Sequence, residues 1–388
     1  MLGNIIGWAH TPFGKLDGLT LEDLIKKVTV DALKHAEIEA GDVDEIVIGH
    51  FNQGLDAQGF PSSLVLQADE RLRMKPSVRV ENACATGSAA VRHGATLIAS
   101  GQARIVLVIG AEKMTHSSPE VVRQALLSAS YVSEEGSADQ SFAGHFGRIA
   151  ELYFQQYGNQ SDALALIAAK NHRNGASNPL AHMQRDFGFE FCSTVSDKNP
   201  LVSGPLRRTD CSMVSDGAAA LVLVNNDVAA TARRTIGLRT ITHVNDFLPL
   251  SRRNPTRFEG AEHAWKLALN TAGITLDNLD FVETHDCFTI AELIEYEAMG
   301  LTPRGQGRRA LDEGWVEPDG RLPVNLSGGL KAKGHPIGAT GVSMHVMSAM
   351  QLDGTATGIQ LPSPQLGGIF NMGGTAVANY VSVLERLQ

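Results

Sequence analysis

Two stretches of this chain show the same succession of hydrophobic and polar positions. Around Leu33, apolar residues recur with helical spacing, a short polar loop follows, and residues 44–48 form a β-branched run. The stretch around Leu269 repeats this order at an unchanged offset and ends in a similar run at 280–284. The matching positions are Leu33, Ala36, Ile38, Val43, Asp44 and Ile46 in the first copy and Leu269, Ala272, Ile274, Leu279, Asp280 and Val282 in the second. A repeated helix, loop and strand predicts two similar α/β halves.

A second, looser repeat supports the same division. Residues 216–224 and 373–383 each begin with small residues and continue into a strand-like run. Because the expected strands are separated by helices, the pattern favours mixed sheets that are covered by helices.

The region between the halves has a different pattern. From about Met114 to Leu206, the strand pattern fades into polar helices and turn-rich loops. We expect an insertion that covers one half and caps a substrate pocket, with an ordinary helical subdomain as the alternative. The expected division is 1–113 plus 207–230 for the N-terminal half, 114–206 for the loop domain, and 231–388 for the C-terminal half.

Composition limits the kinds of partner. The 388 residues exceed the size at which one core usually stops growing, which agrees with a duplicated unit. A net charge of −9 without a dense Lys/Arg run argues against nucleic acid and anionic membranes as partners. No apolar run reaches the ~18 residues of a membrane span. Four irregularly spaced cysteines, and an N-terminus without a leader pattern, predict a cytoplasmic protein with free thiols.

Cys84 lies where a strand is expected to turn into a helix. Residues 78–83 have strand character, and the small-residue run 85–100 suits a helix squeezed between sheets. Unpaired N–H groups and the dipole at a helix N-terminus lower the pKa of a thiol and can hold an oxyanion. Cys84 is therefore a candidate nucleophile, although a buried cysteine is also a common small hydrophobic residue.

Two further segments carry titratable side chains. His285 and Cys287 share one expected strand end, two residues apart, so that they can face the same side. Such a pair can suggest a metal, but no other His/Cys cluster has ligand spacing, so we predict no metal. The thiol can instead act as an acid or base if its pKa falls near neutrality. His335, between Gly334 and Pro336, lies on a glycine-rich turn that fits a functional histidine and a surface histidine about equally.

In combination, these motifs resemble the thiolase superfamily, specifically the sterol-carrier-protein type of thiolase. The resemblance spans essentially the whole chain and rests on four segments in order, which are Cys84 with its helix start, His285-Asp286-Cys287-Phe288, Gly334-His335-Pro336 and Asn371-Met372-Gly373-Gly374. It implies the thiolase fold, with two βαβαβαββ halves in a five-layered αβαβα arrangement and an inserted loop domain. It also implies a homodimer or tetramer with acyl-CoA C-acetyltransferase activity in lipid metabolism. Coenzyme A is then a co-substrate, and no cofactor is permanently bound.

The resemblance also assigns roles to individual residues. Those with catalytic roles are Cys84, His285, Cys287, His335 and Gly373. Cys84 takes the acyl group, and His335 activates that thiol and donates to a substrate oxygen. Most thiolases place a second cysteine where this chain has Asn371, so Cys287 is expected to move protons instead. His285 then helps to hold an oxyanion, and the N–H groups of Cys84 and Gly373 hold the oxyanion of the acyl thioester.

Two alternatives stay open. A decarboxylating ketoacyl synthase shares the fold, but it needs a second active-site histidine in place of a thiol, and Cys287 argues against it. In the second alternative, the chain is a thiolase-like subunit that requires a small partner protein of the OB-fold and zinc-ribbon type for activity.

Several other side chains are weaker candidates. Charged residues in the insertion and just after it can meet CoA phosphates, although a solvated surface is the more frequent role, and no CoA contact is predicted firmly. These residues are Lys170, His172, Arg173, Arg207 and Arg208. Met114, His116 and His145 are candidates for the acyl pocket, with packing as the safer expectation. Cys192 and Cys211 are expected to be bystanders.

Overall fold

The computed structural model describes residues 1–137 and 141–387, which contain strands and helices in alternation. The strands are β1 (Asn4–His10), β2 (Glu45–Gly49), β3 (Ser77–Val80), β4 (Ile105–Glu112), β5 (Leu201–Ser203), β6 (Leu206–Arg207), β7 (Gly217–Val224), β8 (Ile236–Asn245), β9 (Phe281–Glu283), β10 (Leu366–Gly373) and β11 (Ala378–Arg386). The α-helices of the first half of the chain are α1 (Leu21–Ala36), α2 (Pro61–Leu64), α3 (Thr86–Ala99), α4 (Pro119–Leu127), α5 (Val132–Glu135), α6 (Phe142–Tyr157), α7 (Ser161–Ala176) and α8 (Gly188–Ser193). Those of the second half are α9 (Asn226–Ala229), α10 (Glu259–Ala272), α11 (Thr289–Ala298), α12 (Gly307–Asp312) and α13 (Ile337–Asp353).

One mixed sheet runs through the described part of the molecule. Its nine strands have the order β3-β2-β4-β7-β1-β8-β11-β10-β9, and β5 and β6 form a separate pair. Strand β2 is parallel to β3 and β4, and β9 is parallel to β10, whereas the other neighbours are antiparallel. The two parts of the sheet join only where β1 pairs with β8, at Asn4 with Gly237 and Ile5 with Ile236.

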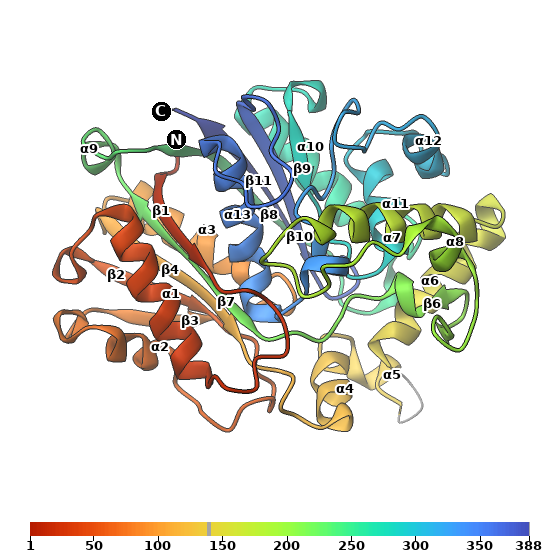
Figure 1. Cartoon of the computed structure of the whole chain (residues 1–388), viewed down its shortest axis with the longest axis horizontal. Helices are drawn as coiled ribbons and strands as arrows, with labels where there is room; N and C mark the ends of the chain where they lie inside the picture. The colour runs from red at the N-terminus through yellow and green to blue at the C-terminus, as the bar shows by residue number, and fades with distance from the viewer. Residues whose placement is uncertain (138–140, 388) are drawn as a thin grey trace.

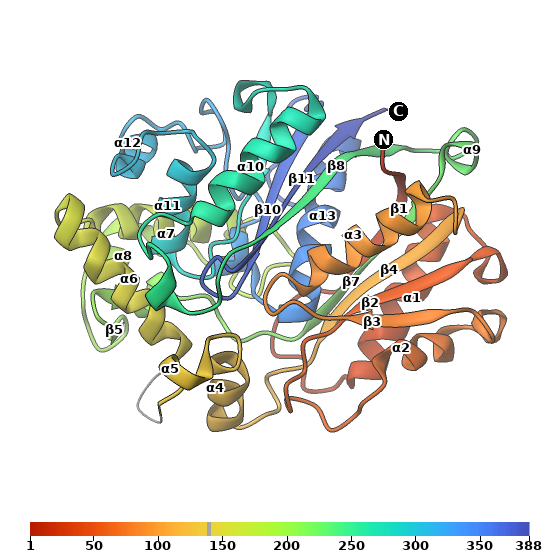
Figure 2. The ribbon, with the colours of Figure 1, turned by 180° about the vertical axis from the view of Figure 1, so that it is seen from behind.

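Helices lie on both sides of each part of the sheet (Figures 1 and 2). Helix α1 packs on β1, β4 and β7, and α10 packs on β8 and β11. Between the two parts, α3 packs on β2 and β4, and α13 contacts β4, β7 and β10. The layers are therefore α1, the first part of the sheet, the α3 and α13 pair, the second part of the sheet, and α10. The predicted α/β class with five layers is confirmed.

The sequence repeat corresponds to a repeated structural unit. Helix α1, a 3₁₀ turn at Ala40–Asp42 and β2 form the first copy. Helix α10, a 3₁₀ turn at Leu276–Asn278 and β9 form the second. The looser repeat corresponds to β7 and β11, which are both antiparallel to their neighbours. Matched hydrophobic patterns therefore predict the two halves of the fold correctly.

The two central helices cross at glycines. A Cβ atom added to Gly87 of α3 would lie 2.6 Å from the backbone nitrogen of Gly341 in α13. Only glycine permits this separation, because any side chain would push the two backbones apart. The close crossing brings the N-terminal ends of α3 and α13 together, and the site described below forms around these ends.

Helix α13 is buried on almost every side, and it contains a histidine whose charge state affects stability. His345 contacts the Gly341 carbonyl at 2.7 Å and the Ser382 hydroxyl at 2.9 Å, and burial lowers its pKa to about 4. Between pH 6.5 and 4, the unfolded chain binds a proton at this side chain and the native protein does not. The contribution of His345 is therefore complete above pH 6.5 and is lost as the pH falls toward 4.

We expect His345→Gln to be less stable than the wild type at pH 7, with a deficit that narrows in acid. The deficit in the free energy of unfolding should shrink by about 1.4 kcal/mol for each pH unit below 6.5. Chemical unfolding at pH 7, 6 and 5 measures it. A deficit that stays constant across this range would show that His345 is protonated in the folded protein.

Within residues 1–137 and 141–387, no helix has both the length and the apolar character that a membrane span needs. The region 114–206 contains α4 to α8 and β5, and none of its described strands joins the large sheet. Its division from the two halves remains a prediction from the sequence pattern.

Candidate active site

Cys84 is held in a tight turn between β3 and α3. Strand β3 ends at Val80 and α3 begins at Thr86, so the expected strand-to-helix position is confirmed. The Asn82 amide donates to the Thr86 hydroxyl at 2.8 Å, and Ala83 has a positive φ of 49°. A non-glycine residue in this conformation is strained, and the surrounding contacts must hold it in place. The turn fixes Cys84 with only 3% of its surface exposed.

The environment of the Cys84 thiol differs from the sequence expectation in one respect. Burial raises the pKa of this thiol to about 12, although the backbone N–H groups of Gly374 and Cys84 act in the opposite direction. The expected lowering by the helix N-terminus is therefore wrong for the unliganded protein, because loss of hydration outweighs the dipole and the N–H groups. The thiol rests in its neutral form and needs a base.

His335 is oriented to be that base. Its Nδ1 atom lies 2.7 Å from the Thr340 hydroxyl, and this hydroxyl donates to the Pro336 carbonyl at 2.9 Å. Since the single hydroxyl proton is used there, the hydroxyl accepts from Nδ1, which must carry the imidazole proton. Burial lowers the pKa of His335 to about 3, so the ring is neutral. Its Nε2 atom has a free lone pair and no partner among the described residues.

His285 has the opposite tautomer, and Asn371 determines it. The Asn371 amide nitrogen donates to the Cys84 carbonyl at 3.2 Å, which fixes the orientation of the amide. The same nitrogen lies 2.8 Å from Nδ1 of His285, so this Nδ1 accepts and Nε2 carries the proton. Burial, followed by His335, lowers the pKa of His285 well below its ordinary value. Its Nε2–H is a donor with no partner in the described structure.

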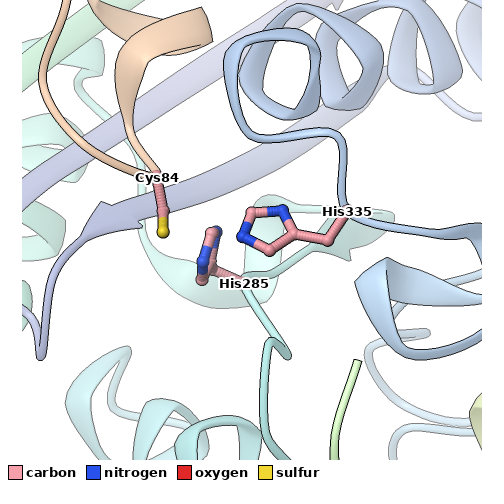
Figure 3. A group of neighbouring side chains, drawn as sticks. All are labelled: Cys84, His285 and His335. Carbon is pink, nitrogen blue, oxygen red and sulfur yellow. The ribbon is translucent and has the colours of Figure 1, made fainter. Parts of the chain in front are cut away.

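The three groups converge on one point (Figure 3). The Cys84 sulfur and one ring nitrogen of each histidine lie within 4.8 Å of one another, and the two rings are 5.2 Å apart and nearly perpendicular. A base, a donor and a nucleophile therefore face the same small space. Three such atoms at this spacing also fit a metal ion, so the metal-free site remains a prediction that a chelator can test.

Cys287 lines the same cavity as Cys84 and His335. Only 3% of its surface is exposed, and its carbonyl accepts from the Ser212 amide at 2.9 Å. Burial, then the proximity of Cys84 and of nearby carboxylates, raises the pKa of Cys287 well above its ordinary value. The condition for acid–base action that the sequence analysis named, a pKa near neutrality, is therefore not met by this thiol. The thiol is protonated and can donate a proton, and it can act as a base only after that donation.

The cavity has a volume of about 650 Å³ and opens to solvent beside the insertion. Apolar side chains form most of its wall, and they include Met114, Val122, Leu126, Phe142 and Phe288. Met114 lines this cavity, whereas His116 and His145 are not among its described lining residues. A mostly apolar cavity that is lined by two thiols suits a thioester substrate.

The structure also adds residues that the sequence did not indicate. Asn371 was noted only as a missing cysteine, and Thr340 was not singled out, yet each sets the tautomer of one histidine. The N–H that lies against the Cys84 sulfur belongs to Gly374, one residue after the predicted Gly373. Thr340 lies only five residues after His335, so the sequence spacing could have indicated it, whereas Asn371 and His285 are 86 residues apart and cannot be paired from spacing alone.

Most of the basic side chains that were considered for CoA phosphates are engaged elsewhere. Lys170 forms a buried ion pair with Glu292 at 3.0 Å, and Arg207 forms one with Asp210 at 2.9 Å. Arg173 pairs with Glu317. A buried ion pair would lose its compensation if one partner turned to a ligand, so Lys170 and Arg207 are poor candidates, whereas the pair of Arg173 is exposed and does not exclude a ligand.

Comparison with known proteins identifies the family. The model described as "Thiolase, N-terminal domain" matches residues 4–187, and the model described as "Thiolase C-terminal domain-like" matches residues 244–386. An acetyl-CoA acetyltransferase of Methanothermobacter thermautotrophicus is 34% identical over 388 residues, which cover 98% of this chain and 99% of that protein. Sterol carrier protein 2 of Oryctolagus cuniculus is 29% identical and matches 95% of this chain and 69% of its own length.

Solved structures agree on the fold. A chain of the Ltp2-ChsH2(DUF35) aldolase superposes with a TM-score of 0.84 at 21% identity and covers 99% of this chain and 97% of its own. The Acat5 thiolase of Ascaris suum in complex with coenzyme A gives a TM-score of 0.75 at 19% identity, with 99% of both chains covered. Together with the matched family models, these likenesses confirm the resemblance that the motifs carried: the chain belongs to the thiolase family and is an acyltransferase.

Proposed function

We propose that this enzyme cleaves 3-oxoacyl-CoA with coenzyme A, and catalyses the reverse Claisen condensation, through an acyl group on Cys84. The observation that carries the proposal is the convergence of the Cys84 sulfur with nitrogens of His285 and His335 at the end of an apolar cavity. Relatives named acetyl-CoA acetyltransferase and a related fold with bound coenzyme A support this substrate class.

In the first stage, Nε2 of His335 takes the proton of the Cys84 thiol, and the thiolate attacks the 3-keto carbon. The C2–C3 bond then breaks, and its electron pair passes to the departing acetyl-CoA enolate. The Nε2–H donors of His285 and His335 stabilise the enolate oxygen, and each donor contributes about 3 kcal/mol by analogy with other oxyanion sites. The Cys287 thiol protonates C2, acetyl-CoA leaves, and an acyl thioester remains on Cys84.

In the second stage, the Cys287 thiolate takes the proton of incoming coenzyme A. The resulting CoA thiolate attacks the acyl thioester, and the tetrahedral oxyanion is held by the N–H groups of Cys84 and of Gly373 or Gly374. The intermediate collapses with Cys84 as the leaving thiolate, which recovers its proton from His335. Every proton is returned, so the enzyme ends in its starting state, and the reverse order of steps gives condensation.

A direct assay tests the proposal. Purified protein is mixed with acetoacetyl-CoA and coenzyme A, and loss of the 3-oxoacyl absorbance is followed with and without a chelator. Chelator-insensitive thiolysis supports the proposed reaction. Thiolysis that stops when metal is removed would contradict the metal-free mechanism.

The role of Asn371 gives a more specific test. In Asn371→Asp, a carboxylate replaces the amide donor, so Nδ1 of His285 should gain the proton and Nε2 should lose it. We expect the C–C bond step to slow by about 10²- to 10³-fold, because one oxyanion donor is lost. Acylation of Cys84 by acetyl-CoA, which does not form an enolate, should change much less. Nitrogen NMR of the histidine rings reports the tautomer, and an unchanged spectrum with equally reduced rates in both steps would indicate only structural damage.

A second candidate function follows from the same convergence. A decarboxylating ketoacyl synthase needs a second active-site histidine. His285 meets this requirement, because it lies beside Cys84 together with His335. Cys287 in the same cavity still favours the thiolase reaction. Release of CO₂ from a malonyl thioester by the wild type, without thiolysis of acetoacetyl-CoA, would favour the synthase.

Assembly and location complete the proposal. A homodimer or tetramer is supported by β3, which forms one edge of the sheet, and by exposed apolar side chains in and near it: Phe60, Met74 and Val78. A small OB-fold or zinc-ribbon partner is the alternative requirement, and the printed pairing of Ltp2 with ChsH2(DUF35) motivates it. Absence of thiolysis activity until such a partner is added would establish that requirement. We place the enzyme in the cytoplasm and in lipid metabolism, as the sequence predicts.

A further inference from the structure

A second cavity, of about 910 Å³, lies behind the active-site cavity. Helices α7 and α8, the segment before β6 and the π-helical turn at Gly329–Lys333 contribute its walls. Val202, Cys211, Ser212 and Met213 line both cavities, so the two spaces share one wall. Cys211 also forms a β-bridge with Phe288, which directly follows Cys287. The second cavity is therefore adjacent to the reacting thiols.

The charged and titratable side chains of this cavity, apart from the Cys211 thiol, are basic. They are His172, Arg185, Lys198, Arg208 and Lys331, and none of the described lining residues is acidic. Arg185, Lys198 and Arg208 are exposed, whereas His172 and Lys331 are each 2% exposed. The protein as a whole carries a net charge of −9, so a local group of cations is unusual and would attract an anion.

Lys331 lies in this cavity without a partner. Its ammonium makes no hydrogen bond and no ion pair with any residue of 1–137 or 141–387. The nearest carboxylates already have other donors, since Asp286 accepts the amides of Leu330 and Lys331 and Asp210 pairs with Arg207. Burial lowers the pKa of Lys331, because an ammonium without a bound anion is costly there, and a ligand that supplies a negative charge would stabilise the charged form.

His172 supports the same conclusion. It is buried beside Lys331, its Nδ1 atom has no partner among the described residues, and burial together with Lys331 lowers its pKa to about 2. A neutral imidazole next to an ammonium can donate its N–H to an anionic ligand, and it adds no positive charge of its own to the cavity wall.

The remaining wall is apolar and aromatic. Phe187 and Phe191 are stacked with ring centroids 4.8 Å apart, and Arg185 lies over Phe187 at 4.9 Å. Met183, Met213 and Val202 complete this surface. A ligand that fits must therefore combine an apolar body with an anionic end.

We propose that this basic cavity binds a carboxylate at the far end of the substrate's acyl group, with Lys331 as its counter-ion. The proposal rests on the proposed function, because the acyl chain must start from Cys84. Cys211, Ser212 and Met213 line both cavities, so an acyl chain that extends from Cys84 beyond these residues would place its far end in the basic cavity. The enzyme then prefers 3-oxoacyl-CoAs whose acyl chain ends in a carboxylate over methyl-ended chains of equal length.

The wild type alone can test this preference. Thiolysis is measured for a series of 3-oxoacyl-CoAs that end in a carboxylate, each paired with the methyl-ended thioester of the same length. We expect kcat/KM to favour the carboxylate by about tenfold or more at one chain length, because a charge-assisted hydrogen bond to a buried ammonium is made only there. Equal values at every length would overturn the inference, while activity on the methyl-ended substrates would still support the thiolase reaction.

Variants locate the cation. In Lys331→Met, the ratio of the two kcat/KM values should fall to about 1 through a higher KM for the carboxylate substrate, and Lys331→Arg should restore part of the preference. The thermal unfolding of each variant checks that it folds. A ratio that stays at the wild-type value, or a KM for coenzyme A that rises equally with both substrates, would overturn the assignment, since the latter would mean that Lys331 binds a phosphate of the nucleotide.

Discussion

Cys84→Ala is expected to abolish acyl-enzyme formation and to reduce thiolysis by about 10⁴-fold or more. The expected loss is large because, among the cysteine and carboxylate side chains of the described residues, only Cys84 forms a group with both histidines within 4.8 Å. Intact mass measured after incubation with acetyl-CoA should show an added acetyl group on the wild type and none on the variant.

Cys192→Ala is the matched control for this experiment. Cys192 is as fully buried as Cys84, but it packs among Ala165, Ala168 and Ala169, away from the reacting groups. The control should be acylated as the wild type is. Equal acetyl incorporation in Cys84→Ala and the wild type would show that another residue carries the acyl group.

The fold was largely predictable from the chain, because its signals are periodic and repeated. The offset between the helix around Leu33 and the helix around Leu269 is constant, so each unit confirms the other, and the structure gives both as helix, turn and strand. The junction of the two halves was not predictable. It depends on two residue pairs between β1 and β8, which carry no pattern of their own.

The members of the site were also predictable, whereas their charge states were not. Cys84, His285, Cys287 and His335 come from motifs that can be seen in the sequence. In the structure, Cys84, Cys287 and His335 line one cavity, and His285 lies beside Cys84 and His335. The sequence suggested thiols whose pKa is lowered or lies near neutrality, because helix ends and motifs are local features that can be recognised along the chain. Burial is not local, and in this site it outweighs the helix end for both cysteines.

Asn371 shows the limit of comparing motifs. As a replacement for a cysteine, it indicates only that one chemical group is missing. In the structure, its amide connects the Cys84 carbonyl to His285 and thereby turns that histidine into a hydrogen-bond donor. The loss of one thiol and the gain of one donor are thus linked, and the proton-moving role falls to Cys287.

Cys287→Ala should therefore separate the two halves of the reaction. We expect acetyl-CoA to acylate Cys84 in this variant, because His335 and the backbone N–H groups remain in place. Condensation of the acetyl-enzyme with a second acetyl-CoA should fall by about 10³-fold, since Cys84 carries the acyl group and the remaining thiol of the cavity wall, Cys211, donates to the Arg207 carbonyl. Intact mass measures the first step, and formation of acetoacetyl-CoA measures the second.

Exchange of the C2 hydrogens of acetyl-CoA with deuterated solvent isolates the proton transfer itself. Cys287→Ala should lose this exchange while it still forms the acyl-enzyme. Cys84→Ala should lose both, because Cys287 gives up its proton only to the coenzyme A thiolate that acylation of Cys84 releases. Acylation without exchange in Cys287→Ala cannot arise from a general loss of packing, because damage to the cavity would reduce both steps. Full condensation activity in Cys287→Ala would instead assign the proton transfer to one of the histidines, and the buried, protonated thiol would then be only part of the cavity wall.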